Sequence, residues 1–93
     1  MRVQLFSVFD TKSRIYLAPF VARSQVDATR QIASSFRDPQ MKDTPVGQNP
    51  EDFELFLVGS FDDESGDMSV CKPTFVANLG NLRDDSRGST VSS

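Results

Sequence analysis

The segment 53–61, FELFLVGSF, limits the possible folds of this chain more than any other feature. Its apolar residues occupy both alternating sets of positions, so a strand formed here has two apolar faces. The segment 3–9, VQLFSVF, shares this property. Strands with two apolar faces are usually central in a sheet or covered on both sides. We therefore expect both segments to form central or covered strands.

Residues 14–22 predict a second strand, because they are rich in β-branched and aromatic side chains. A polar turn with its tip at Lys12 separates this segment from residues 3–9, and the two runs together predict a hairpin. Pro19 has no N–H to donate to a neighbouring strand, which indicates a sheet edge or a bulge.

A helix is expected next, with Ser24 as its N-cap. Three apolar residues then recur at helical spacing: Ala28, Ile32 and Phe36. The helix should end at Asp38, because a residue before a proline avoids the α region. Residues 39–52 contain three prolines and few apolar side chains, which predicts a long loop.

After the strand at 53–61, residues 62–67 predict a turn in which Gly66 takes a positive φ. Residues 68–72 predict a shorter strand that Pro73 ends. The apolar spacing from Phe75 onward permits a short helix.

The expected fold is therefore α+β, a small β-β-α-β-β domain with a mainly antiparallel sheet and one helix on one face. The chain has 93 residues and buries about 64% of its surface on folding, which supports a single core. We expect one domain over residues 1–82 and a flexible tail over 83–93, because the tail is polar and small.

The sheet face opposite the helix would then be apolar. We expect four side chains on that face: Phe6, Val8, Phe56 and Val58. A chain of this size has little left to cover them, and exposed apolar patches often mark interfaces, so a homodimer is predicted.

Composition argues against most kinds of enzyme. The chain has no histidine and one cysteine, Cys71, so a disulfide framework and a cysteine-based zinc site are excluded. The acidic residues in 62–67 lack the spacing of a calcium loop. We expect no catalytic residue, no metal and no cofactor. No apolar run reaches the roughly 18 residues of a membrane span, and a soluble protein of a reducing cytoplasm is expected.

Charge is divided unevenly along the chain. Residues 1–50 hold seven basic and four acidic residues, a net +3, whereas residues 51–93 hold three and nine, a net −6. Cations interleaved with aromatic side chains are typical of surfaces that bind single-stranded nucleic acid. The predicted DNA-binding residues are Lys12, Arg14, Tyr16, Phe20, Arg23, Arg30 and Arg37.

Three stretches of the sequence resemble a known family. They are VFD at 8–10, APFVARS at 18–24 followed by a helix, and PEDFELFLVGSFDDESGDM at 50–68. In this order they are similar to the small nonstructural protein of the gokushoviruses, which are microviruses of bacteria with single-stranded DNA. The resemblance covers roughly residues 3–73, and Pro50 to Gly66 is its most specific part.

The resemblance implies a non-enzymatic bacteriophage protein that acts in the host bacterial cytoplasm and is absent from the virion. It implies DNA binding in viral DNA replication, at the switch from double-stranded intermediates to single-stranded genomes for packaging. Viral replication proteins are further possible partners. The family supplies no binding residues, so the seven residues above come from charge and aromatic spacing alone.

A second function class fits the same sequence. A protein-interaction module could bind the replication initiator or a host protein through its apolar sheet or its acidic hairpin, without touching DNA. The net charge of −3 favours this alternative, because many DNA-binding proteins are basic overall. Retention on heparin at low salt would separate the two classes.

Overall fold

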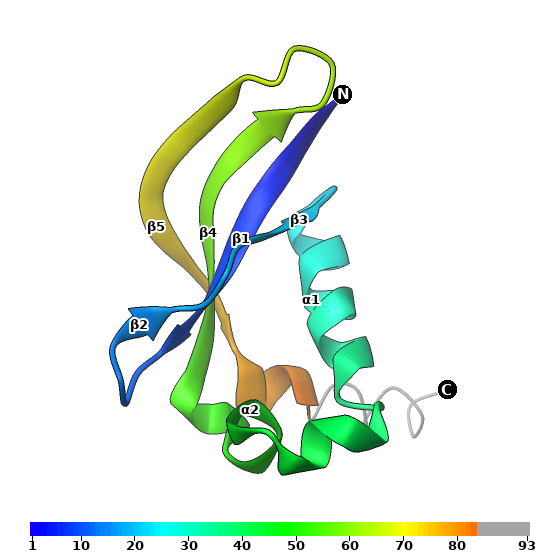
Figure 1. Ribbon diagram of the computed structural model, residues 1–93, viewed down its shortest axis with the longest axis vertical. Helices are drawn as coiled ribbons and strands as arrows, with labels where there is room; N and C mark the ends of the chain where they lie inside the picture. Colours follow the sequence, from blue (N-terminus) through cyan, green and yellow to red (C-terminus); the bar gives the residue numbers. More distant parts are fainter. Residues whose placement is uncertain (84–93) are drawn as a thin grey trace.

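The computed structural model describes residues 1–83 (Figure 1). Its elements follow in the order β1 (Arg2–Asp10), β2 (Ile15–Tyr16), β3 (Phe20–Ala22), α1 (Gln25–Ser35), η1 (Pro39–Asp43), α2 (Pro45–Gln48), η2 (Pro50–Asp52), β4 (Phe53–Asp62) and β5 (Met68–Asn78), where η1 and η2 are 3₁₀ helices. A last helical turn covers residues 79–83. Within the described residues, no helix is long and apolar enough to cross a membrane.

The five strands form one antiparallel sheet in the order β2-β1-β4-β5, with β3 also paired to β1. Figure 1 shows α1 beside this sheet next to β3, and α2 at the end of the sheet where β4 begins. The predicted α+β architecture, an antiparallel sheet with one helix packed against it, is confirmed.

The core lies between α1 and one face of the sheet. Its buried side chains are Phe6, Val8, Ala22, Ala28, Phe53, Leu55, Leu79 and Leu82. The expectation that Phe6 and Val8 lie opposite the helix is therefore wrong. Because side chains alternate along β1, Ser7 and Phe9 take the opposite face instead. Phe56 is the cross-strand partner of Ser7 and lies on that opposite face, as expected.

The second predicted strand is broken into two. β2 and β3 pair with the same edge of β1, and the residues between them, 17–19, belong to no strand. Pro19 explains the break, because it cannot donate a hydrogen bond to β1. The break is held in place by Ser7, whose hydroxyl donates to the Leu17 carbonyl at 2.6 Å.

β5 runs further than predicted, through Pro73 to Asn78. β5 is an outer strand, where the missing N–H of a proline can face solvent. The short helix predicted from Phe75 therefore begins only at Leu79. The register shifts along the β4–β5 pair, between Leu55 and Phe56 and again between Leu57 and Gly59, absorb the irregularity.

Two local predictions are confirmed and one is refined. The Asp27 N–H donates to the Ser24 hydroxyl at 3.1 Å, so Ser24 caps α1. Gly66 has a φ of 78° in the β4–β5 turn. The predicted loop at 39–52 contains the three short helices η1, α2 and η2, each with a proline near its start.

The single domain 1–82 and the flexible tail 83–93 stay predictions, since residues 84–93 lie outside the described part.

Candidate nucleic-acid interface

The sheet face turned away from α1, here called the open face, carries a line of aromatic rings. Phe9 alternates with the buried Val8 and so points to the open face. Tyr16 is the cross-strand partner of Phe9. Phe56 is paired with Phe75 on its other side, and cross-strand partners share a face. The four strands therefore bring together the aromatic row, which consists of Tyr16, Phe9, Phe56 and Phe75.

The rings of the aromatic row touch one another in sequence. The centroid of Phe9 lies 4.6 Å from that of Tyr16 and 6.0 Å from that of Phe56. Phe56 lies 5.7 Å from Tyr16 and 5.9 Å from Phe75, both in edge-to-face geometry. Such contacts fix ring positions. Because Tyr16 is 44% exposed and Phe75 54% exposed, both ends of the row are open to solvent.

Arg14 stands at the Tyr16 end of the row. Its guanidinium carbon lies 5.9 Å from the centroid of the Phe9 ring. The turn that carries it is built on Asp10, whose carboxylate accepts from the N–H groups of Lys12 at 2.9 Å and Ser13 at 3.2 Å. Desolvation acts to raise the pKa of Asp10, but these hydrogen bonds outweigh it and the pKa lies below its ordinary value. The turn therefore holds Arg14 beside the Phe9 ring, and Lys12 lies exposed in the same turn.

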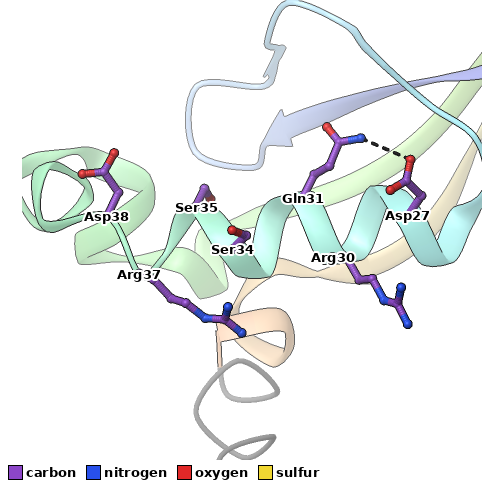
Figure 2. Close-up of a pocket in the computed structure, with 7 residues that line it drawn as sticks. All are labelled: Asp27, Arg30, Gln31, Ser34, Ser35, Arg37 and Asp38. Atoms are coloured by element: carbon purple, nitrogen blue, oxygen red, sulfur yellow. Dashed lines mark hydrogen bonds between the residues drawn. The ribbon is translucent and has the colours of Figure 1, made fainter.

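A second group of cations lies on the α1 side of the molecule. Arg30 and Arg37 project from the same side of the helical segment, as Figure 2 shows. They line a cavity of about 770 Å³ together with Asp27, Gln31, Ser34, Ser35 and Asp38. Two carboxylates thus accompany the two guanidinium groups, which makes this surface less suited to a polyanion than the Arg14 end of the open face.

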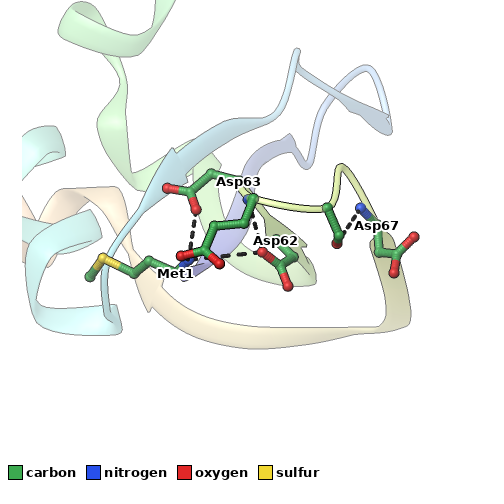
Figure 3. Close-up of polar contacts among 6 residues, drawn as sticks. Met1, Asp62, Asp63 and Asp67 are labelled. Carbon is green, nitrogen blue, oxygen red and sulfur yellow. Dashed lines mark hydrogen bonds and ion pairs between the residues drawn. The ribbon is translucent and has the colours of Figure 1, made fainter.

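The acidic β4–β5 turn binds the N-terminus of the chain. The Met1 ammonium lies 2.7 Å from the Asp63 carboxylate, 3.3 Å from that of Glu64 and 3.8 Å from that of Asp62 (Figure 3). The hydrogen bond that the ammonium donates to Asp63 is the main reason that the pKa of the ammonium is raised. Because Arg2 of β1 pairs with Asp62, this acidic turn lies at the opposite end of β1 from Arg14. Its carboxylates are therefore held away from the aromatic row.

The sequence matches a known protein family. The family model described as Phage ORF5 protein matches residues 3–82. The chain belongs to the Phage ORF5 protein family. Neither a curated protein nor a solved structure matches it. The matched region contains β2 to β5 and all of β1 except Arg2, so it includes the whole aromatic row, and the chain is a bacteriophage protein.

The seven residues predicted to bind DNA fall into three places in this phage protein. Lys12, Arg14 and Tyr16 lie together at one end of the open face. Phe20 lies on the helix side, where its ring stacks on Phe6 at 6.0 Å. The remaining three, Arg23, Arg30 and Arg37, lie just before, on and just after α1.

Three members of the aromatic row were not among the residues predicted from the sequence: Phe9, Phe56 and Phe75. Phe9 and Phe56 had a usable signal, since each alternates with residues of the buried core along its strand. Phe75 had none, because its place beside Phe56 depends on β5 continuing past Pro73.

Proposed function

We propose that this phage protein binds single-stranded DNA on its open face, with bases stacked against the aromatic row. The main support for this proposal is the aromatic row, which joins four rings across four strands and has an exposed ring at each end. Base–aromatic stacking contributes about 1–3 kcal/mol per base. A duplex stacks its bases internally and offers none to such a row, so a single strand is the better ligand.

Positive charge at one end of the aromatic row favours contact with the DNA backbone. Lys12 and Arg14 supply the cations for phosphates at the Tyr16 end of the row. Glu54 opposes them, because it is the cross-strand partner of Phe9 and so shares the open face. With so few cations, we expect modest affinity, and each neutralised phosphate should add about 0.7 to the slope of log affinity against log salt.

The resemblance to gokushovirus nonstructural proteins supports a role in viral DNA replication. We propose that the protein acts in the host bacterial cytoplasm, outside the virion, and supports the switch from double-stranded replication to single-stranded genome synthesis and packaging. Binding the new single strand would keep it from being copied again. Stacking and phosphate contacts need no catalytic residue, metal or cofactor, so the proposed role is non-enzymatic.

A homodimer is part of this proposal. The end of the open face near the acidic turn carries aliphatic side chains that remain largely exposed, among them Met68 at 62% and Val70 at 84%. This aliphatic part lies on β5 beyond the aromatic row, toward the β4–β5 turn. A second copy could cover it while leaving the rings accessible.

The direct test is fluorescence anisotropy of a labelled dT20 oligonucleotide, titrated with protein at 50 and 200 mM salt and compared with a duplex of the same length. We expect saturable binding that prefers the single strand and weakens at the higher salt. Phe75→Ala should weaken it about tenfold, the equivalent of one stacked base. The control is Val26→Ala, which shortens an equally exposed but non-aromatic side chain on α1, outside both the aromatic row and the proposed dimer surface, and should leave binding unchanged.

The acidic β4–β5 turn favours a second candidate function. Asp62, Asp63, Glu64 and Asp67 gather at one tip of the molecule, which suits a basic protein partner such as the replication initiator or a host protein. Under this alternative the protein would not bind dT20 or be retained on heparin at low salt. A pull-down of replication proteins that is lost on neutralising Asp63 and Glu64 would then support it.

A further inference from the structure

Three interruptions of the sheet meet at one place on the open face. β4 carries one residue more than β1 at Val58, because Phe6 pairs with Leu57 whereas Leu5 pairs with Gly59. β5 changes register at the same level, close to Pro73. The outer edge of β1 is interrupted at residues 17–19, between β2 and β3. Bulges and breaks of this kind often shape a sheet next to a functional site.

The interruptions border an open surface cavity of about 400 Å³. Its lining residues come from the break, from β2 and from three further strands: Ser7, Tyr16, Leu17, Ala18, Pro19, Val58 and Pro73. None of these side chains is charged. Tyr16 belongs both to this cavity and to the aromatic row, so the cavity opens beside the rings.

We propose that this cavity holds one nucleobase, unstacked from its neighbours, of the single strand that crosses the aromatic row. This inference rests on the proposed function. The volume falls within the range of small-molecule sites. The uncharged lining suits the base and rejects the phosphate, whereas Arg14 and Lys12, in the turn that leads into Tyr16, provide the positive charge for the phosphates on either side. The uncharged cavity thus matches the uncharged base, and the cations beside it match the charged phosphates.

The cavity also accounts for a preference between single strand and duplex. A base can enter it only after leaving its stack. A duplex must give up base pairing and stacking for this, at a cost of a few kcal/mol, whereas a single strand gives up much less. Base insertion would therefore favour single strands in addition to the effect of the aromatic row.

Ala18→Leu tests the inference by filling the cavity. Ala18 is exposed and precedes a proline, so an extended backbone accepts the larger side chain. With labelled dT12 we expect about tenfold weaker binding for Ala18→Leu, the loss of one base contact, and a smaller loss for Ala18→Val. The control is Val26→Leu, which enlarges an exposed aliphatic side chain on α1 and should bind like the wild type. Thermal unfolding of each variant verifies its fold.

The results of these binding experiments distinguish base insertion into the cavity from stacking on the aromatic row. Weaker binding by Ala18→Leu and Ala18→Val, with Val26→Leu unchanged, supports base insertion. Wild-type affinity in a folded Ala18→Leu variant, together with weak binding by Phe75→Ala, overturns the cavity inference and leaves the proposed function standing. Absence of dT12 binding by the wild type overturns both.

Discussion

The guanidinium carbon of Arg14 lies 5.9 Å from the centroid of the Phe9 ring, on a backbone with a φ of 62°. Arg14 is the only non-glycine residue of the described chain with a positive φ. The left-handed region costs a side-chain-bearing residue roughly 1–2 kcal/mol. A cation–π contact with Phe9 of about 0.5–1 kcal/mol offsets this only in part. The turn therefore holds an arginine where a glycine would be less strained, and this arginine stands at the end of the aromatic row.

Arg14→Gly should separate stability from binding. Relief of the backbone strain and loss of the cation–π contact act in opposite directions, so the free energy of unfolding should change by less than about 1 kcal/mol. DNA affinity at 50 mM salt should fall several-fold, because a phosphate contact is lost. Urea unfolding and dT20 anisotropy measure the two quantities. A variant that binds as tightly as the wild type would remove Arg14 from the interface.

Glu54→Gln should strengthen DNA binding. The Glu54 carboxylate shares the open face with Phe9 and repels phosphates there. Its removal should raise affinity for dT20 about two- to threefold at 50 mM salt and less at 200 mM, since salt screens exposed charges. Asp67→Asn removes the same charge from the acidic turn at the far end of the sheet and should have little effect. Equal gains in both variants would indicate that net charge alone matters.

The two faces of the sheet should differ in their contributions to stability. Leu55 is fully buried between the sheet and α1, and Leu55→Ala should lower the free energy of unfolding by about 2–5 kcal/mol. Phe75 is more than half exposed on the open face, so Phe75→Ala should cost about 1 kcal/mol or less. Urea unfolding compares the two. A loss of several kcal/mol for Phe75→Ala would mean that the open face is part of a covered core.

Much of the fold could be predicted from residue patterns, but less of the site. Alternation located β1 and β4, Ser24 located the start of α1, and Gly66 located a turn. Both faces of β1 are apolar, however, so its pattern could not say which set packs on α1. That choice depends on tertiary packing, and it placed Phe6 in the core.

The same limit explains why the predicted binding residues do not all lie on one face of the sheet. Tyr16 and Phe20 were predicted on one strand, but the break at Pro19 separates β2 from β3, and Phe20 pairs with Phe6 on the core side. The cavity at Val58 arises from a bulge, and bulge positions depend on how two distant strands align. Local sequence carries little information about such alignment.

The N-terminal ion pairs should make stability depend on pH above neutrality. The hydrogen bond that the Met1 ammonium donates to Asp63 raises the pKa of the ammonium above 8.0. The charged form therefore stabilises the fold fully below pH 8, and this contribution is lost as the pH rises through the higher folded value. Urea unfolding between pH 7 and pH 10 should show a larger loss for the free amine than for the N-acetylated chain. Identical pH profiles would mean that the contact adds nothing in solution.

Asp62 should make the stability of the fold depend on pH in the acid range. The N–H of Glu64 is the main cause that lowers the pKa of Asp62 below its ordinary 3.8. Its contribution is present above pH 3.8 and is lost as the pH falls through the lower folded value. In urea unfolding, Asp62→Asn should therefore make the free energy of unfolding depend less on pH in the acid range. The loss of stability at alkaline pH, which comes from the Met1 ammonium, should remain.

The fluorescence emission of Tyr16 reports whether DNA binds at the aromatic row. The chain has one tyrosine and no tryptophan, so its intrinsic fluorescence reports on the aromatic row alone. We predict that dT12 quenches this emission saturably at 50 mM salt and only weakly at 200 mM, with N-acetyltyrosinamide as the correction for absorption by DNA. Phe75→Ala should shift the midpoint to higher DNA concentration. Emission that stays constant at dT12 concentrations that saturate the anisotropy signal would mean that the DNA binds away from the aromatic row.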